Sequence, residues 1–372
     1  MPIDADSLGG WRLVNSVRNP WGQIPVTAGG KSLSGRAREY MDNLLAQGRA
    51  HDPVSRRHHY VPKSYLRQWS FDDKRVWTLD TVTGVVKPVG LRDVCVKEDF
   101  YRVVGSDGAP HNRVELLFGV VDSELRRVQL LFDNLEDPDS LEFDDLVGLG
   151  VSTAVQRMRT LQQRRLQLQN NKWMVAQNPE QQNQSIDSDS DNPHRLAGFH
   201  TEILFEAMWY ATDVLTTRQI EVWHDPQGRF MTCDAPVLVP FRRNVRPSLM
   251  AAPYIVWPVS PHRVVALSND LVGEKAVIRQ ATGKLVGIVR EGVEQGRERM
   301  IFASEEQRDR LPNGKRFGRR TQPRLRCSDR TPSGEYIPPP GCCVEWSEAF
   351  ARGPDVALCN RGLHSPAPEM WS

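Results

Sequence analysis

The chain has 372 residues, of which 39% are hydrophobic and 25% are charged, and its formal net charge at pH 7 is +2. These values are typical of a globular protein with a substantial core, and the small net charge excludes a strong overall attraction to nucleic acid or membrane. No apolar run is long enough to span a bilayer, and residues 1–6 lack the features of a secretory signal. We therefore expect a cytoplasmic protein without a membrane partner.

The first part of the chain contains few periodic segments. Residues 1–50 are interrupted by Gly and Pro and predict an extended arm with one short helix over residues 34–47. The segment that follows, residues 56–69, combines His58 and His59 with a Pro and several basic and aromatic residues, and its end predicts one or two helical turns. Residues 75–80 and 85–89 flank a turn that contains Gly, which predicts a β-hairpin.

Two long amphipathic helices are predicted next, over residues 114–135 and 141–170, because apolar residues recur there at helical spacing. In the first helix, an offset of seven residues puts Glu115 and Asp122 on one side, so these two acids could serve one site. The second helix carries Gln156 and Arg159 beside its apolar face. An Arg in that position usually extends its charge to solvent or forms a salt bridge.

The remaining chain alternates between polar and structured segments. Residues 178–193 hold one apolar residue in sixteen and predict a disordered loop. A helix over residues 194–215 is followed by short β-like runs at 218–223, 230–232, 237–240, 254–258 and 264–267, which predict an antiparallel sheet. A last helix is expected over residues 284–295 and a strand over residues 299–303.

These elements predict an α+β fold in which long helices pack on a small, mainly antiparallel sheet, with extended N- and C-terminal segments. We expect an N-terminal arm (1–50), a single domain (51–305) and a basic, Pro-rich tail (306–372) that contains cysteines. Cys95 and Cys233 lie in apolar contexts and are expected to be packed, reduced thiols. The tail cysteines Cys327, Cys342, Cys343 and Cys359 are poor candidates for a zinc site, because two of them are adjacent.

Three segments, residues 58–69, 232–237 and 257–262, together resemble a bacterial family catalogued as domain of unknown function 4238. Members open on a His-Tyr-Val-Pro segment with a Tyr/Phe-Leu-Arg continuation, and later carry Thr-Ser-Asp-Asn-Pro-Val and Pro-Leu-Ser-Pro segments. This chain has Cys233 where Ser is usual and Ala235 where Asn is common. The resemblance covers residues 55–305 and implies a fold of mixed helices and sheet. It also implies that Glu115, Gln156 and Arg159 are the family's helical polar positions, but it implies no reaction.

The first functional hypothesis is a metal-dependent phosphodiester hydrolase, similar to a nuclease. His59 and Asp234 would hold a divalent cation that activates water, with Glu115 as a third catalytic residue. The substrate contacts would come from four further residues: His58, Arg67, Gln156 and Arg159. The His-His segment resembles the first part of His-Asn-His nucleases, but the partner residues of a ββα-metal unit are missing.

The second hypothesis is a binding or regulatory protein without catalysis, in which His59, Glu115, Arg159 and Asp234 form a structural network of buried polar groups. Asp234 ends a β-like run and precedes Pro236, so it is also suited to capping a turn. A third hypothesis is nucleic-acid binding through the Arg-rich residues 308–330. Proximity of His59 and Asp234 in a cleft would favour catalysis, whereas burial without a cavity would favour the network.

Overall fold

The computed structural model describes residues 55–104, 108–165, 167–168, 171, 193–239, 249, 252–269 and 274–312. The expected helix at residues 34–47, nearly all of the loop at 178–193, the tail beyond residue 312 and the four tail cysteines lie outside these residues. Among the helices that the structure describes, none is long and apolar enough to cross a membrane.

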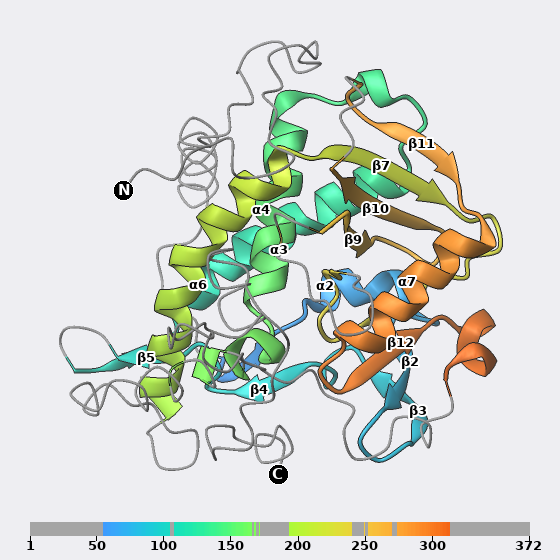
Figure 1. Ribbon diagram of the computed structural model, residues 1–372. Coiled ribbons are helices and arrows are strands. Elements are labelled where there is room, and N and C mark those ends of the chain that lie inside the picture. The colour runs from blue at the N-terminus through green and yellow to red at the C-terminus, as the bar shows by residue number, and fades with distance from the viewer. Residues whose placement is uncertain are drawn as a thin grey trace, which may run out of the picture.

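Two four-stranded sheets form the β part of the fold (Figure 1). The first sheet has the order β11-β7-β10-β9, with the strands β7 (Gln219–His224), β9 (Tyr254–Pro258), β10 (Arg263–Ser268) and β11 (Val277–Gln280). In this sheet β11 is parallel to β7, and the other pairs are antiparallel. The second sheet has the order β3-β2-β12-β8 and is antiparallel throughout, with β2 (Arg75–Asp80), β3 (Val86–Gly90), β8 (Thr232–Cys233) and β12 (Met300–Ala303).

The β-like runs after residue 218 were expected to form one sheet, and this expectation is wrong. Residues 232–233 form β8, which pairs with β12 in the second sheet, while β7, β9 and β10 belong to the first sheet. In the described part of the expected run at 237–240, residues 237–239, the strand pairing is one isolated bridge, between Leu238 and Val256. Pro236 precedes this bridge, and a Pro has no N–H to donate to a strand ladder, which limits strand pairing there.

Two further strand pairs are short. β1 (Arg57–His59) pairs with β4 (Val96–Glu98), and β5 (Val103–Val104) pairs with β6 (Pro110–His111). The first pair holds both histidines of the His-Tyr-Val-Pro segment in extended backbone. Successive side chains of a strand point to opposite faces, so His58 and His59 face different surroundings.

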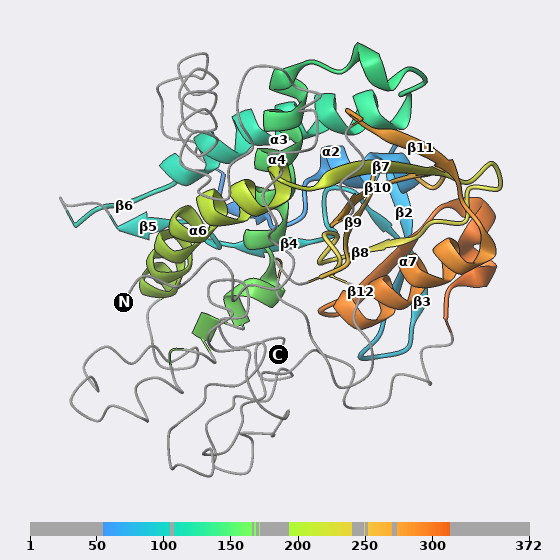
Figure 2. The same cartoon turned by 45° about the horizontal axis from the view of Figure 1, so that its top comes forward.

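Three long helices lie beside the sheets: α3 (Arg113–Asp133), α4 (Phe143–Met158) and α6 (Pro193–Thr216). The helix α4 packs against both α3 and α6, and the views in Figures 1 and 2 show it between them. The fourth helix, α7 (Gly283–Gly296), contacts β8. The buried face of α3 follows the predicted apolar positions, namely Val114, Leu117, Phe118, Val121, Leu125, Val128 and Phe132.

The second predicted helix is interrupted, contrary to the expectation of one helix over residues 141–170. The helix α4 ends at Met158 with Arg159 as its C-terminal cap, and helix resumes at residue 161. The hydroxyl of Thr160 accepts the backbone N–H of Gln163, which is the contact that an N-cap residue makes. The Thr at position 160 therefore starts a new helical segment, and the break places Arg159 at a helix end.

The three segments that carry the family resemblance meet in the core at Tyr65. This residue belongs to α2 (Lys63–Leu66), which continues into a short 3-10 helix, η3 (Arg67–Trp69). The Tyr65 hydroxyl donates to the carbonyl of Pro258 at 2.7 Å and lies 2.8 Å from the hydroxyl of Thr232. The indole N–H of Trp69 donates to the carbonyl of Phe230 at 3.1 Å. Much of this sequence pattern thus builds the core that holds α2 against both sheets.

Several other expectations are confirmed in the described part. Residues 75–80 and 86–90 form the predicted hairpin, and α6, α7 and β12 lie where the sequence placed them. Cys95 and Cys233 are free and buried. The fold is α+β, as predicted.

Candidate functional site

Arg159 is the centre of the candidate site because it links three elements at the end of α4. Its guanidinium forms an ion pair with Asp122 of α3 and donates from Nη2 to the backbone carbonyl of His59 in β1 at 2.7 Å. It lies over the ring of Phe118 at 4.3 Å from the centroid. The side chain is 1% exposed, so the ion pair fixes Arg159 inside the protein, as the salt-bridge interpretation of this Arg predicts.

Glu115 lies on the same face of α3 as Asp122, two turns earlier. The charge of Arg159 also acts on the pKa of Glu115. Burial raises the pKa of Glu115 to about 7, the charge of Arg159 opposes this shift, and the charge of Asp122 adds to it. The carboxyl oxygen Oε1 is buried and has no hydrogen-bond partner in the described structure. A carboxyl group of this kind is partly protonated at neutral pH and can donate or accept a proton.

Gln156 precedes Arg159 by almost one turn of α4 and is fully buried. Neither the amide nitrogen nor the amide oxygen of Gln156 has a hydrogen-bond partner in the described structure. A buried amide without a partner costs free energy, so it normally has a structural or ligand-binding explanation. Its spacing of three residues from Arg159 puts both side chains on neighbouring positions of one helix face.

His59 contributes a ring nitrogen with no partner in the described structure. Its Nε2 lies 3.2 Å from the carbonyl of Leu91, and a carbonyl only accepts, so Nε2 carries the proton. Nδ1 is then the basic nitrogen. Burial lowers the pKa of His59, and the charges of Arg159, Lys63 and Arg57 lower it further, although the bond to Leu91 opposes them. His59 is therefore neutral at pH 7 and able to accept a proton.

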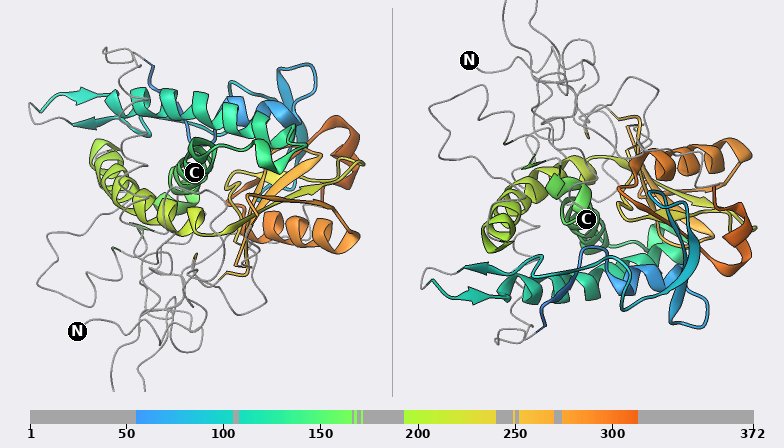
Figure 3. Two further views of the ribbon diagram at one scale, coloured as in Figure 1. Left: turned by 90° about the horizontal axis from the view of Figure 1, so that it is seen from above. Right: turned by 90° about the horizontal axis from the view of Figure 1, so that it is seen from below.

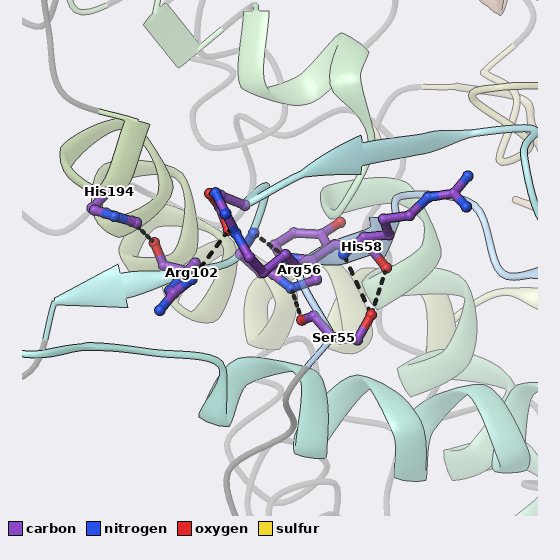
Figure 4. A network of polar contacts seen from close by, with 8 residues as sticks. Ser55, Arg56, His58, Arg102 and His194 are labelled. Atoms are coloured by element: carbon purple, nitrogen blue, oxygen red, sulfur yellow. Dashed lines mark hydrogen bonds and ion pairs between the residues drawn. The ribbon is translucent and has the colours of Figure 1, made fainter.

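His58, by contrast, is fully buried and uses both ring nitrogens within the protein (Figure 4). Its Nε2 donates to the carbonyl of Ser55 at 3.0 Å, and Nδ1 accepts the backbone N–H of Tyr101 at 2.9 Å. The ring also stacks on Tyr101. Figure 4 shows that the same network continues to Arg102, whose carbonyl accepts from His194. The surroundings of His58 are those of a structural residue, whereas the sequence assigned it to substrate binding.

Asp234 lies in a different set of contacts. Its buried carboxylate accepts three backbone N–H groups, from Glu298 at 2.8 Å, Arg299 at 2.8 Å and Met300 at 3.0 Å. These donors precede and begin β12, so Asp234 joins the end of β8 to a strand 66 residues later. In the described residues, the side chains of His59 and Asp234 share no hydrogen bond or ion pair. His59 and Asp234, the two metal ligands that the sequence predicted, thus bond to different parts of the protein.

Arg67, the last predicted binding residue, lies on the exposed side of η3. The described part of the chain has no group of three or more His, Cys, Asp or Glu side chains that could hold a metal ion. Of the sequence-predicted set, the structure thus joins the backbone of His59 to Arg159, puts the carboxyl group of Glu115 within reach of the charge of Arg159, and places Gln156 on the helix that Arg159 caps.

Sequence reasoning placed Asp122 beside Glu115 but gave it no role, and it did not assign Lys63 and Tyr101 to this site. The seven-residue offset from Glu115 was the available signal for Asp122, and the four-residue spacing from His59 was the signal for Lys63. The charge of Lys63 lowers the pKa values of His59 and Asp122, so the ammonium group lies near both. Tyr101 donates its hydroxyl to the carbonyl of Arg159 at 2.5 Å, and no sequence pattern pointed to it.

Comparison with known proteins gives one match. Residues 57–286 match the model of a family described as protein of unknown function (DUF4238). This range includes the His-Tyr-Val-Pro segment, the three long helices and the later segments at residues 232–237 and 257–262. No curated protein and no solved structure matches the chain.

Proposed function

The chain belongs to the DUF4238 family of proteins of unknown function, and we propose that it hydrolyses phosphodiester bonds, with His59 as general base and Glu115 as general acid. One observation carries this proposal. The charge of Arg159, which bonds the backbone carbonyl of His59, acts on both the imidazole of His59 and the carboxyl group of Glu115, and each of these side chains has an atom without a hydrogen-bond partner in the described structure. A base and an acid in one site are the minimum that hydrolysis of a stable ester requires.

The protonation states fit these roles near neutral pH. His59 has a lowered pKa and is unprotonated, while Glu115, with a pKa of about 7, still carries its proton on a large fraction of molecules. Two groups whose surroundings shift their pKa values in opposite directions are typical of an acid–base pair. Burial removes water from around Glu115 and raises its pKa, so the carboxyl group keeps a proton that it can donate near neutral pH.

The proposed step conserves atoms and protons. Water attacks phosphorus while Nδ1 of His59 takes one water proton, and the P–O bond to the leaving alkoxide breaks while Glu115 gives its proton to that oxygen. The products are a phosphomonoester and an alcohol, and later exchange with solvent restores both groups. The ammonium group of Lys63, exposed and near His59, supplies positive charge to the phosphoryl oxygens.

Asp234 has a supporting role in this proposal. The three N–H groups that it accepts occupy much of its capacity to bind a cation, and it joins β8 to β12. Arg159 positions His59 and Glu115 and does not reach solvent. The proposal therefore requires no step at a metal ion, which the assay can test directly.

The test is a hydrolysis assay with the full chain on single-stranded DNA, on RNA and on bis(p-nitrophenyl) phosphate. Each substrate is assayed with Mg²⁺, with Mn²⁺ and with a chelator. We expect turnover that persists in the chelator and falls by about 100-fold or more in His59→Gln and in Glu115→Gln. The matched control is His262→Gln, because His262 also bonds a backbone carbonyl through one ring nitrogen but lies in the β9–β10 connection.

No turnover on any substrate, or equal turnover in all three variants, would contradict the proposal. Turnover that requires a metal and disappears in Asp234→Asn, while the melting temperature is unchanged, would instead support the metal-dependent hydrolase. The melting temperature of each variant is measured beside its activity, since a loss of folding would also remove turnover.

A second candidate is a non-catalytic binding or regulatory protein, in which the same residues form a structural polar network. The observation that favours it is the complete burial of Arg159 and its engagement by Asp122 and by the carbonyl of His59. In that case, Glu115→Gln would change stability without removing any activity. The proposed assay distinguishes the two candidates, because only the hydrolase predicts turnover that depends on His59.

A further inference from the structure

Two exposed cations lie on one face of the short helical segment that follows His59. Lys63 begins α2 and Arg67 begins η3, and a spacing of four residues puts their side chains next to one another. Within the described part of the chain, neither side chain has an ion-pair partner. Two neighbouring cations without a counter-charge repel each other, so their placement on a well-ordered helical segment needs an explanation.

A third cation, Arg126 of α3, lies beside them. The packing of α2 and η3 on α3 is fixed by two hydrogen bonds, from Gln129 to the carbonyl of Tyr65 at 3.1 Å and from Gln68 to Asp133 at 3.0 Å. Burial lowers the pKa of Arg126, and the charge of Arg67 lowers it further. The guanidinium of Arg126 donates to Gln129 and has no carboxylate partner in the described structure.

The acids near this surface do not neutralise it. Asp122 is paired with Arg159, and Asp133 accepts a hydrogen bond from Gln68 of η3. Burial and the charge of Arg67 lower the pKa of Arg126 more strongly than the charge of Asp133 raises it. The three cations Lys63, Arg67 and Arg126, which we call the α2–α3 cationic ridge, therefore keep an excess of positive charge.

The ridge also leads to the candidate site. Lys63, at one end, acts on the pKa values of His59 and Asp122, whereas Arg67 and Arg126 extend away along α2 and α3. Figure 3 shows α2, in blue, beside one end of the teal α3. A polyanion that presents one phosphodiester to His59 and Glu115 would place its neighbouring phosphates along this ridge.

We propose that the α2–α3 cationic ridge binds the phosphate backbone of a nucleic acid and so positions one phosphodiester at the site around Arg159. This inference rests on the proposed function and names its substrate class. The aromatic residues of the segment, Tyr65 and Trp69, are fully buried and cannot stack on bases. Binding is therefore through phosphates alone and is independent of base sequence.

The test measures the affinity of the full chain for a labelled single-stranded DNA oligonucleotide and for a duplex of equal length. The variant is Arg67→Gln/Arg126→Gln, which leaves His59, Glu115 and Lys63 in place. The matched control is Lys284→Gln/Arg290→Gln, which removes the same charge from α7, on the opposite side of the strands from α3 (Figure 3). Melting temperatures of both variants check that the fold is retained.

We expect the ridge variant to bind both oligonucleotides about tenfold or more weakly in low salt, while the control variant binds like the unmodified chain. Each lost phosphate contact should lower the slope of log K against log salt by about 0.7 for a single strand and about 0.9 for a duplex. Two contacts therefore predict a fall of about 1.4 and about 1.8. Asp133→Asn should strengthen binding, because it removes a negative charge that acts on Arg126 of the ridge.

Equal affinity in the ridge variant and the unmodified chain would overturn the proposal, since the Arg-rich residues beyond the described part remain in every variant. Equal, ridge-dependent binding of polyglutamate would overturn the assignment to nucleic acid. The two proposals fail separately. Binding that depends on the ridge without any turnover would refute the hydrolase and keep the ridge, whereas hydrolysis of bis(p-nitrophenyl) phosphate with unchanged oligonucleotide binding in the ridge variant would do the reverse.

Discussion

Arg159 and His59 are 100 residues apart in the sequence, yet the guanidinium of Arg159 donates to the backbone carbonyl of His59 at 2.7 Å. The same guanidinium is paired with Asp122. This arrangement ties the strand β1, the helix α3 and the end of α4 to one buried cation. Replacing Arg159 should therefore change both the stability of the fold and the orientation of His59.

Replacing Arg159 by Met should lower the free energy of unfolding by about 3 kcal/mol, because a partly buried Asp122 would lose its partner. Denaturant unfolding followed by circular dichroism measures this change. The double variant Asp122→Leu/Arg159→Met removes both charges and should recover part of the loss. If the single variant were as stable as the unmodified chain, Arg159 would not be the link between these elements.

The two adjacent histidines should differ in how much their replacement destabilises the protein. His58→Ala should destabilise the protein by about 2 kcal/mol or more, because the backbone N–H of Tyr101 and the carbonyl of Ser55 would lose their partner. His59→Ala should lower stability less, because one ring nitrogen of His59 has no protein partner to lose. Thermal unfolding of both variants tests this order, and a larger loss in His59→Ala would reverse our assignment of their roles.

Asp234→Ala should be among the most destabilising single changes in the chain. Three backbone N–H groups at the start of β12 would lose their acceptor, and each buried unpaired group costs about 1–3 kcal/mol. The expected loss is at least about 3 kcal/mol, measured by denaturant unfolding. Calorimetric titration with Mn²⁺ is the companion measurement: a metal that binds the unmodified chain but not a well-folded Asp234→Asn variant would argue for a ligand role.

Much of the helical structure follows from local patterns that the sequence displays. The periodicity of Val114, Leu117, Phe118 and Val121 predicts α3 because a helix of that length needs one continuous apolar face. The break after Met158 was not predicted, because a Thr inside a periodic pattern is compatible with both an interior position and an N-cap. Only its contact with the N–H of Gln163 distinguishes the two.

The sheets were less predictable because their pairing joins distant segments. The two residues of β8 carry too little pattern to choose between the first sheet and β12, and the parallel strand β11 was not identified. The same limit applies to the candidate site. Glu115 and Arg159 follow from the family resemblance, but the three amide contacts of Asp234 depend on where β12 lies and have no local signal.

Glu115→Gln should change stability in a way that depends on pH. The pKa of Glu115 is about 7 in the folded protein and near 4.5 when unfolded, so the folded state holds its proton more tightly. The contribution of Glu115 to stability is then present below about pH 4.5 and is lost as the pH rises through about 7. Gln carries no such charge. The variant should therefore equal the unmodified chain near pH 4.5 and exceed it at pH 8, by at most about 3 kcal/mol.

The free energy of unfolding of each chain, measured at a series of pH values, gives this difference. Both chains retain His59 and Asp234, so the titration of those two groups cancels in the comparison. A constant difference across the range would mean that Glu115 keeps an ordinary pKa. The same variant should lack hydrolase activity, so that one substitution stabilises the protein at alkaline pH and inactivates it.

The last prediction concerns the pH profile of turnover. It assigns the fall in turnover at alkaline pH (the alkaline limb) and the fall at acid pH (the acid limb) to different residues. Turnover should fall as the pH rises above about 7, because Glu115 loses the proton that it must donate. It should also fall in acid, because His59 becomes protonated at its lowered pKa. Lys63→Met removes a charge that lowers the pKa of His59 and is not among the groups that act on Glu115. This variant should therefore move the acid limb to higher pH and leave the alkaline limb in place. A shift of both limbs, or of the alkaline limb alone, would contradict the assignment of His59 as the base and Glu115 as the acid.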